Sequence, residues 1–102
     1  MKITHYNFTF STDKNLKLIH ERGISFEAVI AVIESGYLVD VIQHPNATKY
    51  PHQKVYIVVV NEYVYLVPFV IEEEGTIFLK TIIPSRKAKK KYLKELKENE
   101  TN

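Results

Sequence analysis

The sequence contains no cysteine, only three glycines and only four prolines among 102 residues. Without cysteine the chain can form no disulfide, no thiolate zinc site and no cysteine nucleophile, which fits a reducing compartment. No apolar run approaches the ~20 residues that a membrane-spanning helix needs, and the polar N-terminal segment is unlike a signal peptide. We therefore expect one cytoplasmic domain covering residues 1–102, with no membrane partner and with frayed residues from about position 98.

Several common catalytic motifs are also missing. The chain has no glycine-rich phosphate loop, no HExxH zinc motif and no GxSxG serine nucleophile. The consecutive carboxylates Glu72, Glu73 and Glu74 fall in an expected turn, where neighbouring side chains diverge, so we interpret them as a solvated acidic tip. We therefore expect no metal and no cofactor.

Positive charge is concentrated near the end of the chain. Residues 1–84 contain seven Lys and Arg against nine Asp and Glu, whereas residues 85–102 contain seven against three. A polyanion or an acidic protein is therefore the first kind of partner to consider.

Two helices are expected in the first third of the chain. Ser11 or Thr12 can cap a helix that ends at Gly23, because a serine or threonine hydroxyl accepts from a free amide and glycine adopts the left-handed stop. Ser25 can cap a second helix that ends at Gly36. Its apolar residues recur at the spacing of one buried face: Phe26, Val29, Ile30, Val32 and Ile33. The short link between the helices predicts an αα-hairpin.

Strand patterns dominate the rest of the chain. A short strand is expected at residues 8–10, and longer ones at 38–42, 55–60, 63–71 and 76–83, with one long loop at 44–53. Pro68 cannot donate to a strand ladder, so we expect a bulge or a sheet edge there. We predict an α+β fold in which the helix pair packs on one face of a four-stranded antiparallel meander sheet, followed by a short basic C-terminal helix.

The last expected strand passes through Pro84 and Ser85 into this basic helix, with Arg86 at its start. A surface of cations and imidazoles without metal motifs suits metal-free RNA cleavage, in which the RNA's own 2′-hydroxyl attacks the adjacent phosphate. Guanidinium groups contact phosphate through paired hydrogen bonds, and a helix start favours an anion. Arg86 is therefore the first candidate for phosphate contact, and the alternative is that it is one more solvated cation.

Other candidate residues have equally plain alternatives. His44 and His52 flank the long loop and can act as acid or base near neutral pH, although loop histidines are often simple surface residues. Four lysines can attract an RNA backbone or form a solvated face: Lys87, Lys89, Lys90 and Lys91. Four tyrosines can stack on bases or only pack within the sheet: Tyr50, Tyr56, Tyr63 and Tyr65.

Two blocks of the chain carry a family resemblance. The first contains residues 8–10, the pair Lys14-Asn15 and the segment GISFE at residues 23–27, and the second is IIPSRKA at residues 82–88. They resemble the aromatic opening, the Lys-Asn pair, the Gly-Val/Ile-Ser-Phe-Glu turn and the Ile-Ile-Ser-Ala-Arg-Arg/Lys-Ala segment of BrnT-type toxins. These toxins belong to type II toxin–antitoxin systems and to the RelE-like ribonuclease group. The chain differs at Phe10, where the family usually has Trp, and at Pro84, where a small residue is common.

The resemblance implies a ribonuclease that inhibits translation, with RNA as substrate and a cognate antitoxin as partner. It implies functional roles for Lys14, Arg86 and Lys87, and a weaker one for Lys54. An antitoxin segment could cover the basic face, and the assembly could bind operator DNA. Two alternatives stay open: a non-catalytic nucleic-acid-binding module, and a protein whose basic helix docks on an acidic partner.

Overall fold

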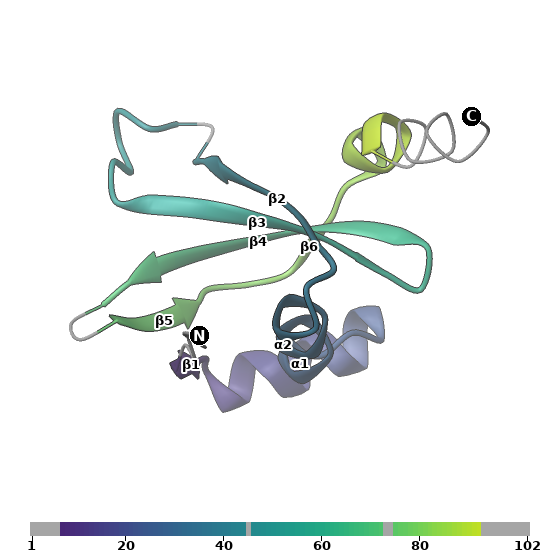
Figure 1. Ribbon diagram of the computed structural model, residues 1–102. Helices are drawn as coiled ribbons and strands as arrows, with labels where there is room; N and C mark the ends of the chain where they lie inside the picture. Colours follow the sequence, from purple (N-terminus) through teal and green to yellow (C-terminus); the bar gives the residue numbers. More distant parts are fainter. Residues whose placement is uncertain (1–6, 45, 73–74, 93–102) are drawn as a thin grey trace, which may run out of the picture.

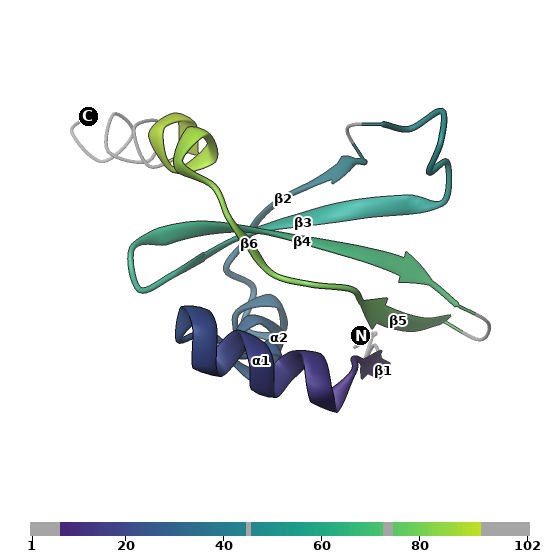
Figure 2. The same ribbon diagram turned by 180° about the vertical axis from the view of Figure 1, so that it is seen from behind.

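The computed structural model describes residues 7–44, 46–72 and 75–92, so the fraying predicted from position 98 lies outside the described residues. The helices lie on both sides of one sheet (Figures 1 and 2). Helices α1 (Thr12–Arg22) and α2 (Phe26–Glu34) cover one face, and a helix at residues 86–92, here called the basic helix, lies beyond the other. The fold class is therefore α+β, as predicted.

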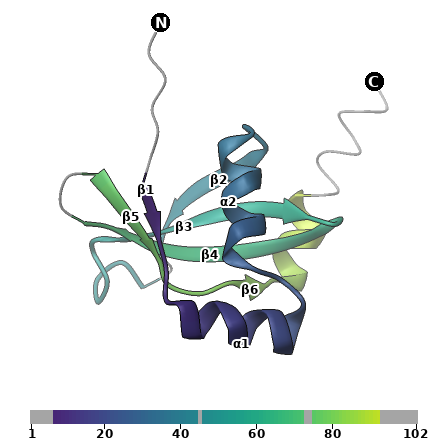
Figure 3. The same ribbon diagram turned by 90° about the horizontal axis from the view of Figure 1, so that it is seen from below.

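The sheet is more complex than the predicted meander. In the described part of the chain its strands are β1 (Asn7–Thr9), β2 (Leu38–Gln43), β3 (Gln53–Val60), β4 (Tyr63–Ile71), β5 (Thr76–Leu79) and β6 (Ile83–Pro84). Their order is β1-β5-β4-β3-β2, and β6 also pairs with β4. The prediction of four antiparallel strands was wrong in its count and in its direction, because β1 joins the sheet parallel to β5 (Figure 3). That pairing joins segments about 70 residues apart, and local patterns do not specify it.

The helix hairpin begins and ends where capping chemistry predicts. The Ser11 hydroxyl accepts a hydrogen bond from the backbone amide of Lys14, and the Ser25 hydroxyl accepts one from that of Ala28, both at 3.1 Å. Gly23 is left-handed, with φ 67°, and its amide closes α1 on a carbonyl of the last turn. Gly36, with φ 87°, follows the last turn of α2 in a Schellman arrangement, in which the next residue's amide, that of Tyr37, reaches Val32.

Asn15 joins the two helices from within the hairpin. Its side chain is only 5% exposed; Oδ1 accepts from the amide of Phe26 and Nδ2 donates to Glu27 Oε1, both at 2.8 Å. Hydrogen bonds lower the pKa of the Glu27 carboxyl. The bond from the Asn15 side chain has the largest effect, and bonds from the Glu27 backbone and from Ser25 add to it. Asn15, Ser25 and Glu27 of the family-like first block therefore have structural roles that hold the start of α2.

Strands β3 and β4 bury side chains on both faces of the sheet. The cluster under α1 and α2 includes alternate strand residues: Tyr56, Val58, Val67, Phe69, Ile77 and Leu79. Val55, Ile57 and Val64 are equally buried but have the opposite parity, so they lie on the face of the basic helix. The continuous run of buried residues in β3 reflects this two-sided burial.

Pro68 coincides with a break in the last strand. The Pro68 carbonyl accepts from the Lys80 amide at 2.8 Å, so its ring nitrogen faces the same neighbour and can return no hydrogen bond. Phe69 pairs with Leu79 and Leu66 with Ile83, so three steps along β4 match four along the partner. The bulge predicted at Pro68 is present, but in the partner segment, and it divides the single strand predicted at 76–83 into β5 and β6.

Candidate nucleic-acid interface

Arg86 is the first residue of the basic helix, and the segment before it is fixed to the sheet. The amide of Ser85 donates to the carbonyl of Val64 at 3.0 Å. The Ser85 hydroxyl then accepts from the amide of Ala88 at 3.1 Å, and its carbonyl accepts from Lys89, so this serine is the N-cap. The predicted handover from strand to helix is confirmed. It leaves Arg86 exposed, just beyond β6.

An aromatic pair lies close to this helix start. The ring centroids of Tyr63 and Tyr65 are 5.5 Å apart, and the Nζ of Lys89 lies over the Tyr63 ring, 4.8 Å from its centroid. This geometry is a cation–π contact. Lys89 is half-buried against this aromatic ring, so it is less solvated than the neighbouring lysines. The side chains of Lys87, Lys90 and Lys91 are exposed, as predicted.

Arg22 was overlooked in the sequence. It is the last residue of α1, and its Nη1 donates to the backbone carbonyl of Ile82, in the broken stretch of the last strand. The contact links the helix layer to the segment that leads into Arg86. A basic residue in the last turn of a helix, just before a glycine stop, was the available signal. We call Tyr63, Tyr65, Arg86 and Lys89 together the cationic–aromatic surface.

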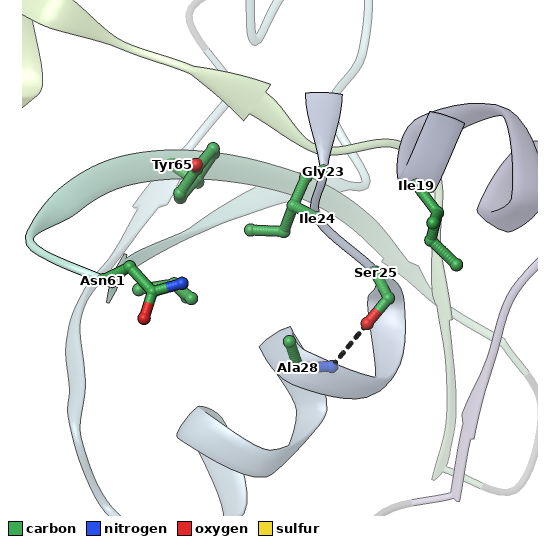
Figure 4. Close-up of a pocket in the computed structure, with 8 residues that line it drawn as sticks. Ile19, Gly23, Ile24, Ser25, Ala28, Asn61 and Tyr65 are labelled. Atoms are coloured by element: carbon green, nitrogen blue, oxygen red, sulfur yellow. Dashed lines mark hydrogen bonds between the residues drawn. The ribbon is translucent and has the colours of Figure 1, made fainter. Parts of the chain in front are cut away.

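A pocket lies beside this surface, between the αα-hairpin and the β3–β4 turn. Its volume is about 270 Å³. Figure 4 shows Tyr65 and Asn61 on the strand side, facing Ile24 and Ala28 across the cavity. The remaining lining comes from Ile19, Gly23, Ser25 and Val60. Tyr65 therefore belongs both to the pocket wall and to the aromatic pair.

The two candidate histidines lie at the far end of the sheet. His44 and His52 flank the loop that precedes β3. Arg86 lies near the other end of this strand, because the residue before it, Ser85, bonds to Val64, and Val64 pairs with Val59 of β3. The rise from the start of β3 to Val59 is roughly 20 Å. His44 Nδ1 accepts from the amide of Asn46 at 3.0 Å and its ring packs on Tyr50, so it stabilises its own loop. Lys54 shares this end of β3.

Lys14 lies in the first turn of α1, half-buried, with its backbone amide bonded to Ser11. It is eight residues before Arg22, about 12 Å along the helix, and α1 and the basic helix lie on opposite faces of the sheet (Figure 1). Arg86 therefore lies away from Lys14 and from the loop histidines, so the structure does not bring these four candidate residues together. Arg86 instead lies one helical turn before Lys89, whose Nζ contacts the Tyr63 ring.

Within residues 7–44, 46–72 and 75–92, no three His, Asp or Glu side chains are grouped so that they could hold a metal ion. None of the helices in this part of the chain is both long and apolar enough to cross a membrane. In comparisons with known proteins, the chain matches no family model, no curated protein and no solved structure.

Proposed function

We propose that this chain is a metal-independent ribonuclease of the toxin class, which holds RNA along the cationic–aromatic surface and inhibits translation. The observation that supports this proposal most is the position of Arg86 beside the Lys89–Tyr63 contact. Cations supply attraction to the phosphate backbone, and aromatic rings supply stacking on unpaired bases, which is the combination that single-stranded RNA requires.

The proposed reaction needs little covalent chemistry from the protein. The RNA 2′-oxygen forms a bond to the adjacent phosphorus, the bond to the 5′-oxygen breaks, and a proton passes from the first oxygen to the second. Negative charge grows on the phosphoryl oxygens in the transition state. The Arg86 guanidinium would stabilise that charge with two parallel hydrogen bonds. The acid–base roles of His44 and His52 stay predictions.

The test compares RNA cleavage by the purified chain with cleavage by Arg86→Ala, both in excess EDTA. Loss of one transition-state donor costs roughly 10²–10³-fold in rate, so we expect a loss of that size. Lys17→Ala removes one exposed cation from α1 and is the matched control. When expressed in bacteria, the unmodified chain and Lys17→Ala should arrest growth, whereas Arg86→Ala should permit growth. Intact RNA and unhindered growth with the unmodified chain would refute the proposal.

A second candidate function is RNA binding without cleavage. The separation of the loop histidines from Arg86 favours it, because the cationic–aromatic surface then contains no imidazole from either candidate. Salt-dependent RNA binding without any product, in the same EDTA buffer, would select this alternative.

As a toxin, the chain would have a cognate antitoxin as its protein partner, and the complex could bind operator DNA. We infer that an acidic antitoxin segment would compete with RNA for the exposed cations Arg86 and Lys87. If the protein instead only docks on an acidic partner, its affinity for RNA should be no higher than that of an unrelated protein with a similar net charge.

A further inference from the structure

The pocket beside the cationic–aromatic surface has no role in the reaction described above, and its lining combines a tyrosine ring and an asparagine amide with apolar side chains. We propose that it takes one unpaired base of the bound RNA and prefers adenine. This inference rests on the proposed function and adds a specificity site to it.

The size of the pocket limits its ligand. Pockets for drug-sized molecules occupy about 300–1,000 Å³, and this one has a volume of about 270 Å³. It therefore suits a flat ring system better than a whole nucleotide. A base would leave its sugar and phosphate outside the pocket, on the side where Tyr65 adjoins Tyr63 and the ammonium of Lys89.

The walls provide both of the interactions by which proteins hold an unstacked base. The ring of Tyr65 is half-buried and can stack on a base, while Ile24 and Ala28 form an apolar opposite wall (Figure 4). The amide of Asn61 is directed toward this wall in the same view. A side-chain amide presents one donor and one acceptor group, which match the N6 and N7 edge of adenine.

The backbone at Asn61 gives a way to test this role without disturbing the turn. Asn61 and Glu62 both have positive φ, 52° and 63°, as the tight β3–β4 turn requires. Asparagine, aspartate and glycine all tolerate this conformation. Asn61→Gly therefore removes the amide and keeps the turn, whereas Ala28→Leu keeps the amide and fills the pocket.

The experiment measures the affinity of the full chain for two short RNAs by fluorescence anisotropy at fixed salt. One oligouridine contains a single central adenosine, and the other contains an abasic site at the same place. A stacked and hydrogen-bonded base is worth about ten-fold or more in affinity, so we expect at least a ten-fold preference for the adenosine RNA. Asn61→Gly and Ala28→Leu should each reduce that preference several-fold and leave the affinity for the abasic RNA unchanged.

The outcomes separate this inference from the proposed function. Equal binding of the two RNAs by the unmodified chain, or a preference that survives in both variants, would overturn the pocket assignment and leave the ribonuclease proposal standing. Arg86→Ala should weaken binding of both RNAs alike and preserve their ratio. Failure to bind either RNA would refute the proposed function and the pocket assignment together. Circular dichroism checks that each variant is folded. If Ala28→Leu is unfolded, Asn61→Gly alone serves as the test.

Discussion

Replacing Asn15 with alanine should destabilise the fold by about 1–2 kcal/mol. The side chain is 5% exposed and satisfies the amide of Phe26, a residue with no exposed surface. Removing the acceptor leaves that buried amide without its partner, at a cost of about 1–3 kcal/mol. The higher helix propensity of alanine returns up to roughly 0.7 kcal/mol. The net loss is a large fraction of the 5–15 kcal/mol that is typical of a domain.

The measurement is urea unfolding of both proteins, followed by far-ultraviolet circular dichroism. A change in midpoint at constant m-value would report a change in stability alone. Lys17→Ala, on the exposed side of the same helix, is the control and should stay within about 0.5 kcal/mol of the unmodified chain. A loss for Asn15→Ala no larger than that of the control would show that Asn15 does not hold the hairpin together, and the Lys-Asn pair would then need another explanation.

Three further predictions concern single contacts. In Asn15→Ala the pKa of Glu27 should rise toward its ordinary value in a carboxyl ¹³C NMR titration. Because the folded-state pKa is depressed, the stability that Glu27 contributes is present above its unfolded pKa and is lost as pH falls through the folded pKa. Asn15→Ala should therefore lose less stability than the unmodified chain over that acidic interval. Ser85→Ala should cost about 1 kcal/mol by removing the N-cap of the basic helix, measured by urea unfolding, and an unchanged midpoint would contradict that role. Lys89→Met should reduce the slope of log affinity against log salt for RNA by about 0.7, and a slope equal to that of the unmodified chain would place Lys89 outside the RNA path.

Local chemistry made the helix hairpin predictable. Ser11, Gly23, Ser25 and Gly36 all act within a few residues of their own position, so their patterns specify the helix ends directly. The pairing of β1 with β5 depends on surfaces that meet only in the folded chain. The uninterrupted apolar run of β3 did contain a sign of burial on both faces, and therefore of a layer on the side opposite α1 and α2.

The candidate site was predictable only in part. The Pro84-Ser85 handover places Arg86 correctly because it uses the same capping chemistry. Its distance from His44 and His52 could have been foreseen, since the loop and the β3–β4 turn lie at opposite ends of one strand. The contacts of Lys89 with Tyr63 and of Arg22 with Ile82 could not, because they depend on the exact path of the chain across the sheet.

The tie between Arg22 and Ile82 has a consequence for synthesis on the ribosome. Arg22 bonds to a carbonyl 60 residues later, and β1 finds its partner only in β5. Both contacts of the N-terminal segment therefore wait until residues 76–82 have emerged, and non-local closure of this kind is slow. A nascent chain would hold α1 through Asn15 but without its contact to Ile82, and the Arg86 surface would form after the helix hairpin. If the chain is the proposed ribonuclease, this order would keep it inactive until these residues have emerged from the ribosome.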